Sequence, residues 1–194
     1  MTEFSAHSEA TPTPSREGYA VPTIAKFKRI GLACFLCGMA ACISVTLIGV
    51  MLLFLGAQLF PLLGFNTDIW IDQKGFGQGL AFATIMAAMN WYVAYFTVPA
   101  AWIAIGFSLG RFPRRGIVHA APYYRWGAIW GAFLVGSTTG IASFLLSSMT
   151  VSTGIGGLLA GLLIGGLAGM LCGALFRSVV RPAEQVRKIQ VDVF

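Results

Sequence analysis

The clearest structural signal in the chain is an uncharged, glycine-rich stretch, 151-VSTGIGGLLAGLLIGGLAGMLCGALF-176. Five of its glycines recur at every fourth position: Gly157, Gly161, Gly165, Gly169 and Gly173. An α-helix places residues four apart along one face, and an apolar helix of this length spans a bilayer. Because helices in lipid associate through close contact at small residues, the row predicts a membrane-spanning helix with a flat packing face.

Shorter rows of small residues occur in two other apolar stretches. They include Gly38 near the N-terminal end of the chain and Gly136 and Gly140 just before the glycine-rich stretch. We interpret these rows as the contact faces of one compact helical bundle. Two alternatives remain for the five-glycine row, which are the assembly of several copies of the chain and the lining of a narrow pore.

The composition excludes an ordinary water-soluble domain. Of the 194 residues, 57% are apolar and 10% are charged, and the mean hydropathy is +0.77, whereas a soluble domain carries about 25% charge. Charge-free runs cover residues 30–67, 75–110 and 126–176. Their lengths predict four transmembrane helices, near residues 30–54, 80–108, 126–147 and 151–176. The hydroxyl-rich turn between the last two predicts a close hairpin.

The basic residues indicate how the chain is oriented. All lysines and arginines except Lys74 precede the first span, lie between the second and third, or follow the fourth. Basic residues are enriched in cytoplasmic loops, so both termini are predicted to be cytoplasmic. The fold class is therefore an all-α integral membrane protein with two in-out-in hairpins, which we place in the inner (plasma) membrane of a bacterium.

Outside the bundle, predicted to span residues 26–177, lie two tails. Residues 1–25 are rich in Ser, Thr, Pro and Glu, a composition that predicts a disordered cytoplasmic tail. Residues 178–194 form a basic cytoplasmic tail in which Val186, Ile189 and Val193 make a modest apolar row. An amphipathic segment of this kind is expected to rest on the inner leaflet.

The loop between the second and third spans mixes cations with aromatic residues. Its cations are Arg111, Arg114, Arg115 and Arg125, which we expect to contact anionic lipid headgroups. The net charge of +6 follows from this topology and requires no nucleic-acid partner.

Side-chain polarity inside the spans is concentrated at Asn90, Tyr92 and Tyr95, a few residues before Pro99. These three residues are the candidate contacts for a small molecule or a lipid. The alternative is that Asn90 makes a hydrogen bond between helices. The spans contain no Asp, Glu, Lys, Arg or His, which disfavours haem binding and transport coupled to protons or cations.

Cys34 and Cys37 have the spacing of a redox or metal-binding pair. A metal site needs more ligands nearby than the sequence offers, and Cys also behaves as a small apolar residue. We therefore interpret these cysteines as packing residues and predict neither a metal nor a cofactor.

No phosphate-binding loop, catalytic triad or dinucleotide-binding motif appears in the sequence. We therefore predict a protein that is not an enzyme but an accessory or assembly component of a larger membrane complex. Its expected partners are membrane lipids and another membrane protein or a second copy of itself. The alternative is a small transporter or channel for an uncharged or lipidic solute.

Overall fold

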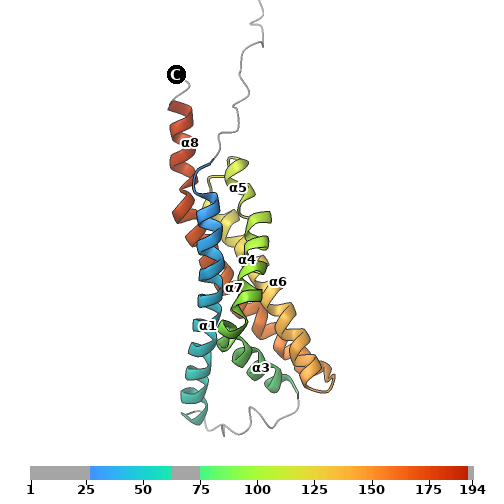
Figure 1. Ribbon diagram of the computed structural model, residues 1–194. Coiled ribbons are helices and arrows are strands. Elements are labelled where there is room, and N and C mark those ends of the chain that lie inside the picture. Colours follow the sequence, from blue (N-terminus) through green and yellow to red (C-terminus); the bar gives the residue numbers. More distant parts are fainter. Residues whose placement is uncertain (1–26, 63–74, 192–194) are drawn as a thin grey trace, which may run out of the picture.

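The computed structural model describes residues 27–62 and 75–191, and it is helical through most of these ranges (Figure 1). The elements in chain order are α1 (Ile30–Leu62), α3 (Phe76–Ala88), the 3₁₀ helix η1 (Asn90–Val93), α4 (Ala94–Phe107), α5 (Arg111–Arg114), α6 (Ala120–Leu146), α7 (Val151–Val180) and α8 (Pro182–Val191). The predicted tail at residues 1–25 lies outside the described residues.

Four helical segments in the described ranges are long and apolar enough to cross a membrane. They are Ile30–Leu59, Asn90–Arg114, Ala120–Leu146 and Val151–Arg187. Their outer surfaces expose many Leu, Ile, Phe and Val side chains, as expected of helices that face lipid. The prediction of an all-helical, multi-pass membrane protein is confirmed.

The second apolar stretch differs from the continuous helix expected over residues 80–108. It forms two helices, α3 and α4, joined by the single turn η1. Pro99 lies within α4 rather than at the break. The break comes at Asn90, whose side-chain Nδ2 donates to the Cys42 carbonyl of α1 at 3.4 Å. An Asn that bonds outside its own helix favours such an interruption.

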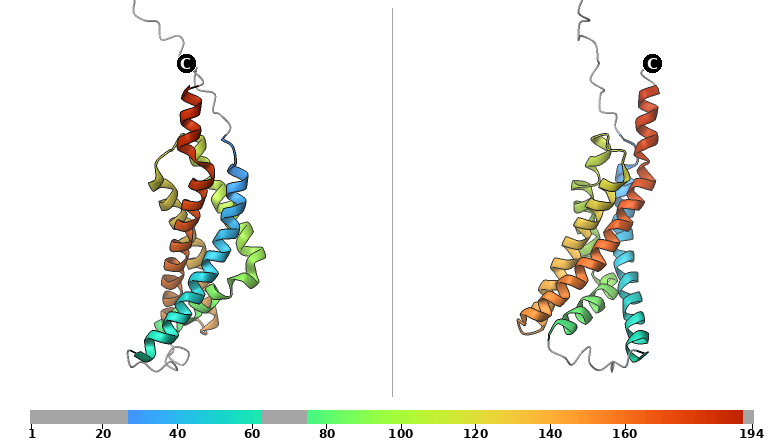
Figure 2. Two further views of the ribbon diagram at one scale, coloured as in Figure 1. Left: turned by 90° about the vertical axis from the view of Figure 1, so that its left-hand side faces the viewer. Right: turned by 180° about the vertical axis from the view of Figure 1, so that it is seen from behind.

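Helix α3 fills a wedge in the bundle. In Figure 2, α1 and the α6–α7 hairpin lie close together near α8 and diverge toward the other end, where α3 lies between them. Glycines allow α3 to approach α7, because a Cβ built at Gly79 would meet the Thr153 carbonyl and one at Gly156 would meet the Phe76 carbonyl. The short helix thus occupies space that the diverging spans leave open.

An aromatic cluster joins the helices at the end of the bundle where α5 lies. The ring of Phe112 stands edge-on to Tyr123 with 5.4 Å between centroids, and Tyr123 stacks on Phe176 at 6.0 Å. The Tyr123 hydroxyl donates to the Ile117 carbonyl at 2.8 Å. These contacts connect α5, α6 and α7, so they hold the short α4–α6 connection against the bundle.

Helix α8 begins where α7 ends, after the left-handed residue Arg181 (φ 48°). The Gln185 side chain accepts a hydrogen bond from the Lys28 backbone N–H at 2.9 Å and donates one to the Lys28 carbonyl at 3.3 Å. Figure 1 shows α8 continuing beyond the end of α7 and away from the bundle. The C-terminal region predicted as a basic tail therefore contains a helix tied to the start of α1.

Candidate hydrophobic binding site

The five-glycine row of α7 lies against α6. A Cβ built on any of these glycines would meet α6 atoms: Ser143 from Gly157, Thr139 from Gly161, Gly131 from Gly165, Gly127 from Gly169 and Tyr123 from Gly173. At Gly161 the built Cβ lies 2.8 Å from the Gly136 Cα. The two backbones are therefore in direct contact, and the row is covered by a helix of the same chain.

The remaining predicted packing glycines have different neighbours. Gly136 and Gly140 lie against Leu162 and Leu158 of α7. Gly38 faces the indole of Trp102 on α4, and the Nε1 of that indole donates to the Phe35 carbonyl of α1 at 3.3 Å. The absence of a side chain at Gly38 therefore leaves a notch for the Trp102 indole, through which α4 packs on α1 and not on the α6–α7 hairpin.

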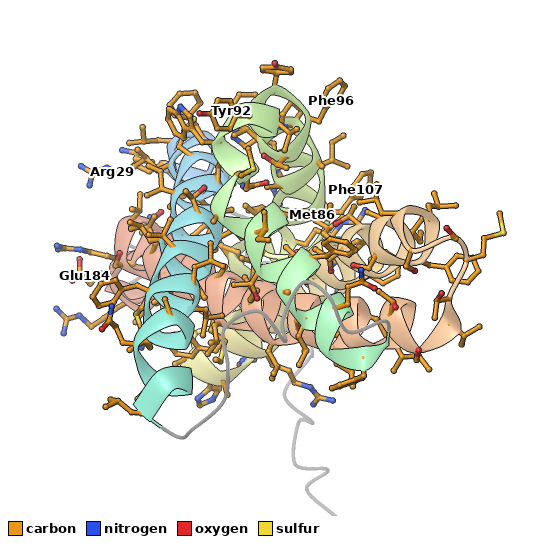
Figure 3. The ribbon with its side chains drawn as sticks, turned by 90° about the horizontal axis from the view of Figure 1, so that it is seen from below. Arg29, Met86, Tyr92, Phe96, Phe107 and Glu184 are labelled. Carbon is orange, nitrogen blue, oxygen red and sulfur yellow. The ribbon has the colours of Figure 1, made fainter. Side chains whose placement is uncertain are left out.

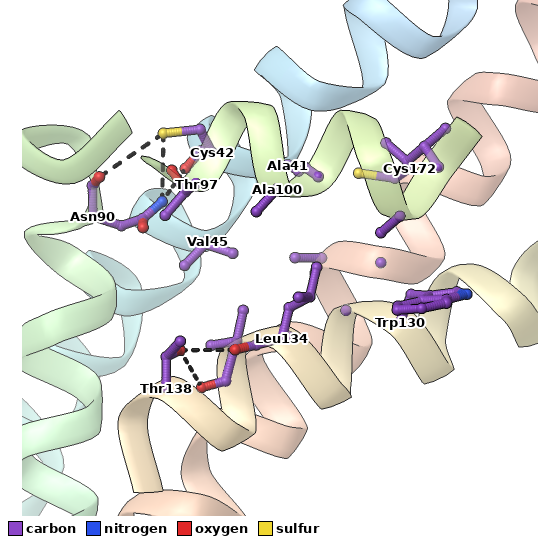
Figure 4. A pocket seen from close by; sticks show the side chains of 18 of the residues that line it. Ala41, Cys42, Val45, Asn90, Thr97, Ala100, Trp130, Leu134, Thr138 and Cys172 are labelled. Atoms are coloured by element: carbon purple, nitrogen blue, oxygen red, sulfur yellow. Dashed lines mark hydrogen bonds between the residues drawn. The ribbon is translucent and has the colours of Figure 1, made fainter. Parts of the chain in front are cut away.

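A cavity of about 450 Å³ separates α4 from the α6–α7 hairpin (Figure 4). Its α4 wall consists mainly of small residues, and its α6 wall includes Trp130 and Leu134. The wall residues are Ala41, Cys42 and Val45 of α1; Met86, Ala87, Asn90 and Val93 of α3 and η1; Phe96, Thr97, Ala100, Ala101, Ala104, Ile105, Ser108 and Leu109 along α4 and just beyond it; Gly127, Trp130, Gly131, Leu134, Val135, Thr138 and Thr139 of α6; and Gly165, Ala168, Gly169 and Cys172 of α7.

The hydroxyl groups of this wall bond to carbonyls of the preceding helical turn. Ser108 Oγ donates to the Ala104 carbonyl at 2.6 Å, and Thr138 Oγ1 donates to the Leu134 carbonyl at 2.7 Å. Trp130 differs, because its Nε1 is buried and finds no acceptor within the described part of the chain. The wall is thus mainly apolar, which is the chemistry of a site for a mainly hydrocarbon molecule.

The structure separates the three residues predicted as ligand contacts. Asn90 is buried (8% exposed), lines the cavity and also makes the hydrogen bond between helices that was its alternative interpretation. Tyr95 lines a second hollow of about 340 Å³ between α1 and α4. Tyr92 lines neither space and is exposed.

The main wall of the cavity lies on α4 residues that were not among the predicted ligand contacts. The signal was a row of small residues that recurs about once per turn along α4 and ends just beyond it: Thr97, Ala100, Ala101, Ala104 and Ser108. Small side chains let helices approach when the partner is also small. Here the facing residues of α6 do not close the distance, so the same row leaves a void.

The two cysteines with redox or metal-binding spacing have different neighbours. Cys37 Sγ donates to the Cys172 carbonyl at 3.4 Å, and Cys172 Sγ donates to the Cys37 carbonyl at 3.5 Å. The partner of Cys37 is therefore on α7, while Cys34 is only half-buried. Within the described ranges, no three side chains of the kinds that bind metals come together.

The four predicted headgroup arginines are exposed on or next to α5 and at the start of α6. Arg111 follows the α4 wall of the cavity most closely, two residues after Leu109. Its guanidinium carbon lies 5.5 Å from the centre of the Phe107 ring. A cation held over an aromatic ring of α4 therefore stands near the α5 end of the cavity.

Comparisons of the chain with protein-family models, curated proteins and solved structures find no match. The function is therefore inferred from the geometry of the cavity.

Proposed function

We propose that this multi-pass membrane protein binds a hydrophobic molecule of the bilayer in the cavity between α4 and the α6–α7 hairpin. The observation that carries this proposal is the 450 Å³ apolar cavity itself. Ligand sites have volumes of about 300–1,000 Å³ and apolar walls with a few placed polar groups. A void of this size inside a spanning bundle is costly unless a molecule fills it.

The rim of the cavity supports entry from the bilayer. Phe96 and Ala100 line the cavity and are also exposed on the outer surface of α4. In Figure 3, which looks along the bundle from below, Phe96 projects from the outer side of α4. A molecule dissolved in the hydrocarbon can therefore reach the cavity without crossing water, which suits an uncharged or lipidic solute.

The chemistry of the wall supports binding or transport without catalysis. The wall residues include thiols and hydroxyls but no carboxylate, imidazole, amine or guanidinium, so the wall offers no general base that could activate a nucleophile. The protein would thus act as a binder or small transporter, and not as an enzyme.

The test is photolabelling of the protein in nanodiscs with a diazirine-bearing hydrocarbon probe, followed by peptide mass spectrometry. We expect labels on the cavity faces of α4 and α6 that are lost in Ala100→Phe, which fills the rim. The matched control is Ile103→Phe, because Ile103 lies on the same helix and is exposed but does not line the cavity. Equal labelling of both variants would contradict the proposal.

The clustering of basic segments at one end of the bundle supports placing both termini on the cytoplasmic side. The start of α1, helix α5 and helix α8 lie toward the same end in Figure 1, and each carries or adjoins arginine. Since the positive-inside rule counts such flanking residues, cytoplasmic reporters fused at either terminus are expected to be active. A reporter that is active only outside the cell would reverse this orientation.

A second candidate function is that of an accessory component of a larger complex. It is favoured by Tyr92 and Tyr95, which are 70% and 75% exposed on η1 and α4. Their neighbour Asn90 bonds to Cys42, which lies about 18 Å along α1 from Ile30 and thus near the middle of a core about 30 Å thick. Tyrosines usually lie at the membrane interface, so hydroxyls at this depth favour acceptors on another protein.

This candidate is tested by gentle extraction and native mass measurement of the intact particle. We expect a heterologous partner that is retained by the wild type and released by the double variant Tyr92→Phe/Tyr95→Phe. A particle that contains only this chain and lipid would contradict it. The five-glycine row would not provide the interface, because α6 covers it.

A further inference from the structure

We infer that the ligand of this cavity is an anionic phospholipid of the leaflet on the α5 side, with one acyl chain in the cavity and its phosphate at Arg111. This inference rests on the proposed function and names the chemical class of its ligand. Two features carry it, which are the length of the cavity and the charge at one end.

The cavity is long enough to hold one acyl chain. Its wall follows α4 from Val93 at the end of η1 to Leu109, just beyond the last residue of α4. The 14 residues of α4 rise about 21 Å, and one leaflet contributes about 15 Å of hydrocarbon. An acyl chain that enters from one surface therefore fits along α4 and ends near Asn90.

The α5 end of the cavity is closed to a headgroup by aromatic rings. Phe112 is buried and stands against Tyr123 and Trp126 of α6, with centroid distances of 5.4 Å and 6.3 Å. A polar headgroup therefore stays outside the bundle, at the surface beside α4 and α5. The chain alone enters the space between the helices.

Arg111 supplies the charge at that surface. It is exposed, and its guanidinium lies over Phe107, which is 59% exposed on α4 and projects toward the α6 side in Figure 3. Within residues 27–62 and 75–191, Arg181 forms a salt bridge with Glu184, and Arg111 has no carboxylate partner. Guanidinium binds phosphate oxygens with strong, charge-assisted hydrogen bonds.

The experiment measures which lipid the protein retains. The full chain is reconstituted in nanodiscs of equal parts phosphatidylglycerol and phosphatidylethanolamine with identical acyl chains, and bound lipid is then quantified by native mass spectrometry after release into mild detergent. We expect about fivefold enrichment of phosphatidylglycerol, the effect of one basic residue on an anionic lipid. Arg111→Gln is expected to bring the ratio close to one while total bound lipid stays the same.

The controls separate this inference from the proposed function. Arg115→Gln removes a second exposed cation that lies one turn further from the α4 wall, so it should preserve the enrichment. Ala100→Phe should remove the lipid altogether, whereas Ile103→Phe should retain it. If Ala100→Phe removes the lipid but the wild type shows no headgroup preference, the inference is overturned and the proposed function stands. If lipid persists in Ala100→Phe, both are overturned.

Discussion

Helix α6 faces α7 and α4 in opposite ways. Against α7 it presents Gly127 and Gly131, which lie opposite Gly169 and Gly165, and the two backbones touch. Toward α4 the larger side chains of Trp130, Leu134 and Val135 stand beside these glycines, and a 450 Å³ cavity remains between the helices. In this bundle a row of small residues closes an interface only where the facing row is also small.

The difference has an energetic basis. Helices in lipid gain little from the hydrophobic effect, so their association depends on van der Waals contact and interhelical hydrogen bonds. The α6–α7 seam has continuous contact and a hydrogen bond from Thr139 Oγ1 to the Gly157 carbonyl at 2.9 Å. Helix α4 instead takes its contacts from α1, which leaves its other face available to a molecule from the bilayer.

The largest effect on stability is expected from Gly165→Ala, which disrupts the close contact between α6 and α7. The new Cβ would meet the Gly131 backbone and lie 2.7 Å from the Val135 Cβ. Overpacking of this kind costs about 1–3 kcal/mol, and we expect the upper end because backbone cannot move aside. Unfolding in mixed micelles with increasing dodecyl sulfate, followed by circular dichroism, measures this change.

Gly166→Ala is the matched control for that prediction. The nearest neighbour of a Cβ at Gly166 is the Ala132 Cβ at 3.9 Å, and Ala favours a helix over Gly by about 1 kcal/mol. We therefore expect unchanged or increased stability. A loss of stability equal to that of Gly165→Ala would show that close contact with α6 is not what makes position 165 sensitive.

A smaller loss is expected from Gly38→Ala, which breaks the attachment of α4 to α1. The new methyl would meet the Trp102 indole, a side chain that can rotate at the cost of its bond to Phe35. We expect a loss of about 1–2 kcal/mol. In a Trp102→Ala background this loss of stability should vanish. Gly31→Ala is a second control and should have no packing cost, because a Cβ built at Gly31 has no neighbouring atom within 4 Å. If Gly38→Ala also destabilises the Trp102→Ala variant, contact with the indole is not the cause of the loss.

Asn90→Ala tests the turn between α3 and α4. It removes the hydrogen bond to the Cys42 carbonyl, for which intramembrane values are about 0.6–2 kcal/mol. Thr138→Val is the control, because that hydroxyl bonds to carbonyls of its own helix and should cost less. If the two variants unfold at the same dodecyl sulfate fraction, the α1–η1 bond does not stabilise the bundle.

The smallest effect on stability is expected from Gln185→Ala, because Gln185 lies on α8, outside both the α6–α7 contact and the cavity. Its bonds to Lys28 are exposed, and exposed contacts of this kind contribute about 0.5 kcal/mol or less to global stability. The change should instead raise amide hydrogen exchange in α8 while exchange in α6 and α7 stays the same. Faster exchange throughout the bundle would show that α8 supports the spans.

Sequence patterns predicted those features that depend on one helix or on neighbours in the chain. The four-residue spacing from Gly157 to Gly173 is set by the helical repeat, and the short turn before Val151 makes α6 its nearest partner. Length and hydropathy predicted the spanning helices in the same way. These signals are local, so no knowledge of distant contacts was needed.

Tertiary structure decided the features that need three helices at once. The break at Asn90 depends on Cys42, 48 residues earlier in the chain, and the notch at Gly38 depends on Trp102. The cavity exists because α4 packs on α1 while α6 packs on α7, which fixes the space between them. The sequence alone determined which faces are small and which segments are apolar, but the volume left between two faces depends on where the other helices hold them.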